Sequence, residues 1–242
     1  MDVALLTVGD ELLAGDTENT NASWLGRQLT AAGATVARVL TVPDSESVIA
    51  DAVARYHEAF DAVVVTGGIG GTPDDVTKAG VAQAFGRDLV VPEDVRAHLE
   101  AKAEAFAADN PEMVDRYDMD LDLDAWASVP EGGQALLTDE SFAAGCVVES
   151  VYVLPGVPEE LQAMYATVAD EFGGDRTTET IYTPAPEGAL VGAITTARER
   201  FAVAVGSYPR KADAPGRVKV TGDDPAAVAD AAAWLRERIE TE

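Results

Sequence analysis

The sequence contains one cysteine and two histidines, and both scarcities exclude classes of functional site. With Cys146 alone, we expect no internal disulfide and no cysteine metal cluster. His57 and His98 each lie in a helical pattern near a glutamate, so we expect them on helix surfaces rather than as bases or metal ligands. A serine–histidine triad and a histidine-rich zinc site are therefore not expected.

Long hydrophobic runs are also missing. No apolar run approaches the roughly 18 residues of a membrane-spanning helix. The chain starts Met1-Asp2-Val3-Ala4, which lacks the basic region of a signal peptide. We therefore expect a cytoplasmic protein with no membrane partner.

Basic residues are scarce: 17 lysines and arginines stand against 43 acidic residues, for a formal net charge of −26. A field of this sign repels phosphate backbones and anionic membranes, so we expect no nucleic-acid partner. An acidic tail, a basic partner, or adaptation of the surface to high salt would each produce such a charge. The acidic residues run from Asp2 to Glu242, which disfavours a tail, and only four of the basic residues are lysines. Because salt at 1 M shortens the Debye length to about 3 Å and makes self-repulsion tolerable, we favour a halophilic protein.

What is present is enough material for a sizeable core, since 47% of the 242 residues are hydrophobic. In the first third of the chain, strand patterns alternate with helical ones. The expected strands are 3–8, 35–42 and 61–66, and the expected helices are 19–32, 45–60 and 78–85. Such alternation is typical of right-handed βαβ units and of a parallel sheet covered on both faces.

The middle of the chain is less regular. We expect a helix over 92–108, a second helix and then a loop within 110–124, a turn at 129–133, and short strands at 135–137, 146–149 and 151–154. The segment Pro155-Gly156-Val157-Pro158 is then expected to open a helix that runs to about residue 172. Residues 173–176 are typical of a linker. We therefore predict two domains, 1–172 and 177–242.

The second domain has the pattern of a small α+β sandwich. Strands are expected at 178–183, 201–207 and 217–222, with helices at 186–200 and 224–239. This βαββα order resembles ferredoxin-like and KH-type folds. The GxxG clamp of KH domains is missing and the chain is acidic, so RNA binding is not expected. Arg210 and Lys211 form a rare basic pair, which we interpret as a solvated loop rather than a phosphate contact.

The densest chemical signal is the segment 66–77, which follows a buried strand and precedes a helix. Its glycines, Gly67, Gly68, Gly70 and Gly71, allow left-handed backbone angles and close approach to a ligand. The N–H groups of the following helix suit a phosphate. The segment is neither a Walker A loop nor a GxGxxG fingerprint. The alternative is structural: Thr72 as N-cap and Asp75 at N3 would form a near capping box.

Acidic side chains follow the first two strands and the glycine-rich loop. Glu11, Asp44 and Asp75 are expected at one edge of the sheet, because the carboxyl ends of parallel strands meet there. Carboxylates beside a phosphate cradle repel an anion unless a cation intervenes, which favours Mg²⁺ or a similar divalent ion. The alternative is helix capping by Asp44 or Ser45, and by Asn19 or Thr20 in the neighbouring loop.

Taken together, these motifs resemble a known family. They are Gly9-Asp10-Glu11-Leu12-Leu13, Thr20-Asn21, Pro43-Asp44, Thr66-Gly67-Gly68, Asp75-Val76-Thr77 and Leu154-Pro155-Gly156-Val157-Pro158. This order resembles the molybdopterin-binding domains of the MoaB/Mog type, which are shared with MoeA. The fuller match, including Gly206-Ser207-Tyr208-Pro209, is similar to the amino-terminal part of CinA and to a domain of some eukaryotic FAD synthases. The loop departs from its relatives in reading Gly70-Gly71 where they often have Gly-Pro.

The resemblance implies a three-layer α/β/α domain with a mostly parallel sheet, usually a homo-oligomer such as a dimer or trimer. It implies a small phosphorylated ligand, either molybdopterin or an adenine nucleotide. Asp44 and Asp75 match aspartates needed by Mog-type proteins, and Glu11 matches a glutamate of MoeA- and CinA-type domains. Those three are the candidate catalytic and metal-binding residues. The candidate ligand-binding residues are Asp10, Asn21, Gly67, Gly68, Gly70, Gly71, Thr72, Thr77, Gly156 and Pro158.

Three functions remain open at this point. The first is a molybdopterin-binding-type protein that holds a phosphorylated pterin or adenine nucleotide, in binding alone or as a transferase of molybdenum-cofactor biosynthesis. The second is a metal-dependent pyrophosphatase that splits ADP-ribose or FAD. The third is a ligand-binding or scaffold module without turnover. The three tryptophans, Trp24, Trp126 and Trp234, are interpreted as packing residues.

Overall fold

The computed structural model describes residues 1–116, 122–211 and 214–242. The chain forms two compact units: Met1–Leu29 with Thr35–Phe172, and Thr30–Ala34 with Gly173–Glu242. Within the described ranges, no helix is long and apolar enough to cross a membrane.

The larger unit is built on a six-stranded sheet in the order β2-β1-β3-β8-β7-β6. Strands β1, β2, β3 and β8 pair in parallel, whereas β7 and β6 extend the sheet antiparallel beside β8. The parallel strands are β1 (Asp2–Val8), β2 (Thr35–Val42), β3 (Ala62–Thr66) and β8 (Val151–Leu154), and the others are β7 (Gly145–Val148) and β6 (Gln134–Leu136). Every residue of β3 is buried, as its continuous apolar run predicts.

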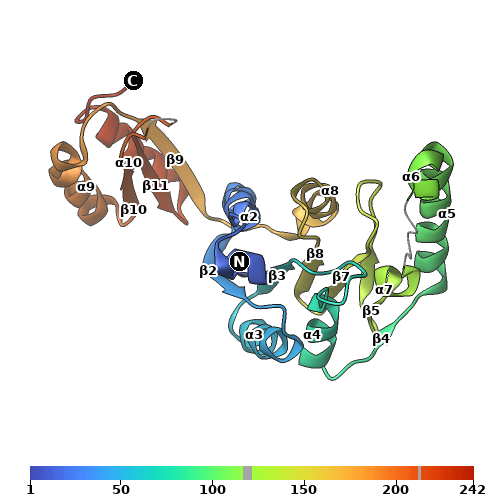
Figure 1. The fold of residues 1–242 in the computed structure, drawn as a ribbon. Helices are drawn as coiled ribbons and strands as arrows, with labels where there is room; N and C mark the ends of the chain where they lie inside the picture. Colours follow the sequence, from blue (N-terminus) through green and yellow to red (C-terminus); the bar gives the residue numbers. More distant parts are fainter. Residues whose placement is uncertain (117–121, 212–213) are drawn as a thin grey trace. The chain divides into compact units, whose positions relative to one another are not determined.

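Helices cover both faces of this sheet (Figure 1). Helices α2 (Thr20–Ala31) and α8 (Pro158–Val168) lie on one face, and α3 (Glu46–Ala59) and α4 (Thr77–Ala84) lie on the other. The core between α3, α4 and the sheet is made of aliphatic side chains such as Ile49, Val53 and Val81. The predicted three-layer α/β/α fold with a mostly parallel sheet is confirmed.

The chain between α4 and β6 holds α5 (Glu93–Asp109), α6 (Pro111–Arg116) and α7 (Leu123–Ala127). Helix α7 begins inside the stretch 110–124, whose second part was expected to be a loop. The turn expected at 129–133 is wrong for residues 129 and 130. Val129 and Pro130 form β5, which pairs antiparallel with β4 (Leu89–Val90). The pairing joins segments about 40 residues apart, so a local pattern does not predict it. Residues 117–121 of the expected loop lie outside the described residues.

Two further segments differ from the expectation. Residues Asp10–Ala14, expected as a loop, form the short helix α1, which ends at Gly15 with a φ of 78°. The helix expected to open at the segment 155–158 does begin at Pro158, but it ends at Val168 and is followed by the 3-10 helix η1 (Ala169–Glu171). The loop 155–157 is thereby left free at the end of β8.

The smaller unit has the predicted βαββα order: β9 (Thr177–Tyr182), α9 (Glu187–Phe201), β10 (Ala204–Tyr208), β11 (Arg217–Gly222) and α10 (Pro225–Arg236). Its sheet is antiparallel in the order β10-β11-β9. The Asp224 carboxylate caps α10 by accepting from the N–H of Ala226, with Pro225 in the first turn. Strand β10 starts three residues later than expected, because α9 continues through Phe201 and ends at Ala202 in the left-handed region.

Candidate functional site

Four loops meet at the carboxyl end of the parallel strands. They follow β1, β2, β3 and β8, of which β1 and β3 are direct neighbours. In open sheets of this kind, ligands bind at this edge, where the strand order reverses and the loops diverge. A cavity of about 310 Å³ lies there and is lined by residues of all four loops. We call it the main cavity.

The glycine-rich loop after β3 approaches β1 too closely for any side chain. Gly67 has a φ of +126°, and a Cβ there would lie 2.1 Å from the carbonyl oxygen of Val8. The flanking loops are tied to this one: the Thr66 hydroxyl donates to the Pro155 carbonyl at 2.6 Å, and the Asn21 amide donates to the Gly156 carbonyl at 2.7 Å. The floor of the cavity is therefore a rigid junction of backbone segments.

Asp75 closes a turn inside the glycine-rich loop. Its Oδ2 accepts from the backbone N–H of Thr72 at 2.9 Å and from the Thr72 hydroxyl at 2.7 Å. The alternative interpretation of Thr72 as a helix N-cap is wrong, because α4 begins at Thr77 and its N-cap residue is Val76. The Thr72–Asp75 pair thus shapes the loop and holds the Asp75 carboxylate at the rim of the cavity.

The other two predicted carboxylates come from neighbouring loops. Asp44 does not cap α3; its Oδ2 instead accepts from the backbone N–H of Asp10 at 2.8 Å and joins the loops after β1 and β2. Glu11 lies over Gly9, where a Cβ would be 2.5 Å from the glutamate Oε1. Capping is confirmed only for Asn19, whose side-chain oxygen accepts from the N–H of Ala22 in α2.

A buried hydroxyl faces the same place. Thr77 is fully buried, and within the part of the chain that the structure describes its Oγ1 has no hydrogen-bond partner. A Cβ on Gly68 would lie 3.2 Å from this oxygen and 3.5 Å from Asp44 Oδ1. Because Gly68 has no side chain, a small space is left between the Thr77 hydroxyl oxygen and the Asp44 carboxylate oxygen.

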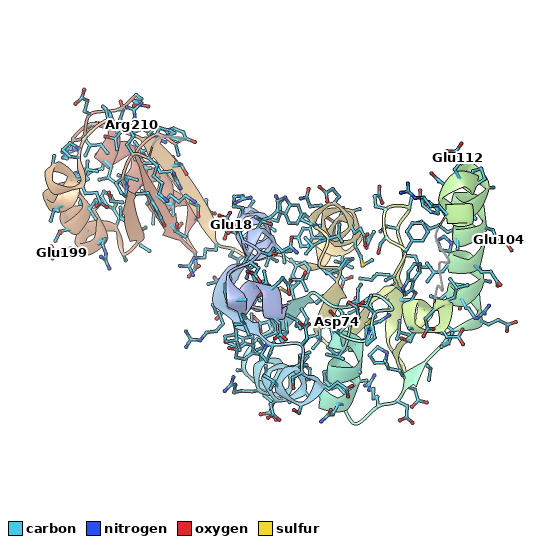
Figure 2. All side chains as sticks on the ribbon, viewed as in Figure 1. Glu18, Asp74, Glu104, Glu112, Glu199 and Arg210 are labelled. Carbon is cyan, nitrogen blue, oxygen red and sulfur yellow. The ribbon has the colours of Figure 1, made fainter. Side chains whose placement is uncertain are left out.

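The main cavity is acidic. Its lining includes five carboxylates, those of Glu11, Glu18, Asp44, Asp74 and Asp75, and no lysine or arginine among the described residues. Figure 2 shows Asp74 at the loop beside the sheet edge. The Thr72 hydroxyl donates to Asp74, and this hydrogen bond lowers the pKa of the Asp74 carboxyl.

The oxygen atoms around the main cavity are of the type that binds hard cations, but they do not form a preformed metal site. Carboxylate and hydroxyl oxygens are the ligands that Mg²⁺ takes, usually one or two carboxylates completed by substrate phosphates. Within residues 1–116, 122–211 and 214–242, no three His, Cys, Asp or Glu side chains are grouped to hold a metal ion. One observation fits a cation that also contacts a bound ligand. Asp44 Oδ1 and the Thr77 hydroxyl, which has no hydrogen-bond partner among the described residues, both lie close to Gly68.

A second cavity of about 540 Å³ adjoins the first across the glycine-rich loop. Gly68, Asp75 and Gly156 line both cavities. The second is bounded by the aromatic rings of Trp126 and Phe142, whose centroids lie 5.7 Å apart. We call it the aromatic cavity.

Trp126 is held against the loop by α7. The Asp122 carboxylate caps this helix, and the buried Lys78 Nζ donates to the carbonyls of Ala125 at 2.7 Å and Trp126 at 3.2 Å. Burial lowers the pKa of Lys78 to about 8. The Trp126 ring reaches Gly71, where a Cβ would lie 2.5 Å from Nε1, so glycine at this position is what allows the ring to lie against the loop.

The structure brings most of the predicted ligand-binding residues to the two cavities. The main cavity is lined by Glu11, Asn21, Asp44, Gly67, Gly68, Asp75, Gly156 and Pro158. The aromatic cavity adds Gly70, Gly71 and Thr72. Asp10 and Thr77 line neither cavity: Asp10 contributes a backbone N–H to Asp44, and Thr77 is buried beneath the loop.

Three residues beside the site were missed by the sequence analysis: Lys78, Trp126 and Phe142. Trp126 was interpreted as a packing residue together with Trp24 and Trp234. Asp122 followed by Leu123-Asp124-Ala125-Trp126 does carry a helix-start signal, an N-cap aspartate. No comparable signal marks Phe142, which lies between elements.

Comparison with known proteins agrees with this geometry. Residues 4–172 match the family described as probable molybdopterin binding domain, and residues 176–242 match the middle domain of FAD synthase. A protein of Archaeoglobus fulgidus is 34% identical over 99% of this chain and 98% of its own length. A CinA-like protein of Citrifermentans bemidjiense is 37% identical over 72% of the chain, which spans only 41% of that longer protein.

A solved structure supports the same relationship. The CinA protein of unknown function from Thermoplasma acidophilum is 31% identical, with a TM-score of 0.61, over 72% of this chain and 99% of that one. The family match over residues 4–172 covers more than half of the chain. The chain therefore belongs to the family of probable molybdopterin binding domains and is related to CinA.

Proposed function

We propose that the two adjoining cavities bind one small phosphorylated ligand, an adenine nucleotide or a phosphorylated pterin. The observation that carries the proposal is their shared lining: Gly68, Asp75 and Gly156 belong both to the polar main cavity and to the aromatic cavity. A ligand with phosphates at one end and a planar ring at the other matches this division. The ring would lie against Trp126 and Phe142, and the phosphates against the glycine-rich loop.

The phosphate end needs help from a cation. Five carboxylates line the main cavity, so a bare phosphate would be repelled at short range. In the proposed complex, Asp44 and Asp75 hold a divalent cation, and Glu11 lies within the same cavity. The cation would neutralise phosphate charge and activate water when bound. The glycines let the backbone approach the phosphate oxygens without a side chain in between.

The same crowding of carboxylates favours a second candidate, a pyrophosphatase acting on ADP-ribose or FAD. In this function Asp44 and Asp75 would hold the cation, which would supply charge neutralisation and activation of water. A cavity carboxylate is the group able to accept a proton, since no histidine lines either cavity among the described residues. Binding and hydrolysis use the same residues, so the structure alone supports both.

One experiment separates them. The chain is incubated in high-salt buffer with ADP-ribose or FAD plus Mg²⁺ or Co²⁺, and AMP is measured by chromatography, while calorimetry records binding of AMP and of a phosphorylated pterin. Cation-dependent AMP release establishes the hydrolase, and binding without release establishes the binding protein. Neither binding nor release leaves a scaffold module and overturns the proposal. Halophilic character and a dimeric or trimeric state stay predictions, checked by activity against salt and by light scattering.

Replacing Trp126 by alanine is expected to weaken ADP-ribose binding about tenfold, because stacking of a base on an aromatic side chain is worth about 1–3 kcal/mol. Binding of inorganic pyrophosphate, which has no ring, should not change. Calorimetry on both ligands measures the difference. Trp126→Phe should retain most of the affinity, and Trp24→Phe, on α2 beside Tyr165, is the matched control. Equal losses for both ligands would show that the substitution disturbs the loop rather than a ring contact.

A further inference from the structure

The charge of this chain is divided very unequally between its two parts. Residues 1–172 hold eight basic and 32 acidic residues, a net charge of −24, whereas residues 173–242 hold nine basic and eleven acidic residues, a net charge of −2. More than half of the basic residues therefore belong to the smaller unit. The exclusion of nucleic acid, which rests on the charge of the whole chain, does not apply to this unit by itself.

The smaller unit has a sheet with two different faces. Helices α9 and α10 pack on one face, over buried residues such as Ile181, Val205, Val218 and Val220. Alternate positions lie on the other face, and no helix of the described part of this unit packs there. We call it the open face; it carries Thr178, Thr180, Tyr182, Ala204, Gly206, Tyr208, Arg217, Lys219 and Thr221.

None of the nine positions on the open face is acidic. Its two tyrosines are well exposed, Tyr208 at 43% and Tyr182 at 50%. On the central strand, Arg217 pairs with both tyrosines and Lys219 lies two residues further along, and within the described residues neither forms an ion pair. The open face thus combines exposed aromatic rings with two basic side chains. One carboxylate, that of Glu242, lines a cavity together with Tyr182 and Arg217 at one end of this face.

Tyr208 has the geometry of a stacking platform. A Cβ on Gly206 would lie 3.3 to 3.5 Å from Cε2, Oη and Cζ of the tyrosine, so the ring lies over this glycine along the strand. The Arg217 guanidinium and the Lys219 ammonium lie 5.1 and 5.7 Å from its centroid. A base stacked on this ring would therefore bring its phosphate within reach of two cations.

We propose that the open face binds single-stranded nucleic acid. Aromatic rings that stack bases, combined with cations that follow the backbone, are the features with which proteins hold single strands without strong sequence preference. Sheet faces that present exposed aromatic side chains bind single-stranded RNA in this way. Tyr208 and Tyr182 stack bases, and Arg217 and Lys219 pair with phosphates. This proposal is independent of the ligand of the main cavity.

The test uses the full chain and fluorescein-labelled oligouridylate or oligothymidylate, with fluorescence anisotropy at low and high KCl. Binding is expected at low salt and should weaken as salt rises, because binding releases counterions from the strand and this release becomes less favourable at higher salt. Tyr208→Ala should weaken binding about tenfold, and Tyr208→Phe should restore it. The double variant Arg217→Glu with Lys219→Glu should abolish binding or lower the slope of log affinity against log salt by about one per lost phosphate contact.

The matched control reverses two charges on the helical side of the same unit. Arg198 and Arg200 are exposed on α9, on either side of Glu199, which Figure 2 shows on that helix. Their reversal to glutamate makes the same change in net charge and should leave binding nearly unchanged. Circular dichroism confirms the fold of each variant at each salt concentration. Equal losses in both double variants, absence of binding at low salt, or a change only in oligomeric state would overturn the proposal. Comparison of the two labelled strands shows whether RNA or DNA is preferred.

Discussion

Asp75→Asn is expected to reduce AMP release from ADP-ribose about a hundredfold or more. The loss of an outer-shell partner of a metal already costs about 10–100-fold, and Asp75 is proposed to contact the cation itself. Asp75 lines both cavities, and two hydrogen bonds from Thr72 fix its Oδ2, which leaves Oδ1 for a cation. Asparagine preserves the shape and an acceptor oxygen but removes the negative charge. Steady-state kinetics with varied Mg²⁺ or Co²⁺ measures the effect. If the chain only binds its ligand, the same substitution should remove the cation dependence of the affinity.

The control is Asp51→Asn, which makes the same change of charge at an exposed position of α3 that lines neither cavity. It should leave the rate and the affinity unchanged. A loss for Asp51→Asn equal to that for Asp75→Asn would assign the effect to the overall field. A fully active Asp75→Asn variant would show that the carboxylate serves only the turn with Thr72.

Prediction from the sequence succeeded where a local pattern and a tertiary role coincide. The segment 62–66 is a continuous apolar run, and such a run is buried in any parallel sheet with helices on both faces. Gly67 is the residue that lets the chain leave this strand beside Val8, and the predicted glycine-rich loop lines a cavity at the sheet edge. The carboxylates Glu11, Asp44 and Asp75 came together because parallel strands end at one edge.

The failures have a different physical origin. Asp44 carries capping chemistry, yet its Oδ2 accepts from the N–H of Asp10, a group that only the tertiary fold brings near. The Thr72–Asp75 pair is local, but it closes a turn in the loop and does not start the helix, which begins at Thr77. The β4–β5 pair and the position of Trp126 beside Gly71 depend on contacts between distant segments. Residue types alone do not reveal such partners, because each of these side chains also has an ordinary local role.

Lys78 gives the second large effect, a pH dependence of stability. Burial lowers its pKa from 10.5 in the unfolded chain to about 8 in the folded one. Between these values the unfolded state binds the lysine proton and the folded state does not, so the contribution of Lys78 to the free energy of unfolding rises with pH. Burial raises the pKa of the Cys146 thiol from 9.0 to about 12, so this thiol contributes the opposite sign above pH 9, both with and without the Lys78 side chain. A shift of this size corresponds to about 3 kcal/mol gained between the two pKa values, since one pKa unit is worth about 1.4 kcal/mol. Below pH 8 the buried charge remains a cost to the folded state.

Lys78→Met is therefore expected to abolish that rise without unfolding the protein. The two carbonyls that Lys78 contacts keep other donors, because Ser128 Oγ donates to Ala125 and the N–H of Ala144 donates to Trp126. Methionine fills the apolar part of the space and leaves neither carbonyl orphaned. Urea unfolding is measured below pH 8 and near pH 10.5, for the parent and for the Lys78→Met variant. The measurement compares how steeply the free energy of unfolding changes with pH in the two proteins.

The readout must come from the larger unit alone, since the two units need not unfold together. Trp126 fluorescence provides it in a background where Trp24 and Trp234 are replaced by phenylalanine. Lys211→Met, at an exposed position of the smaller unit, should leave the slope unchanged. If Lys78→Met keeps the slope of its parent, the folded chain holds this lysine charged at pH 9, and the hydrogen bonds to α7 outweigh its burial. A lost slope with intact Trp126 fluorescence instead establishes that Lys78 is neutral there and that the other donors hold α7 against the glycine-rich loop.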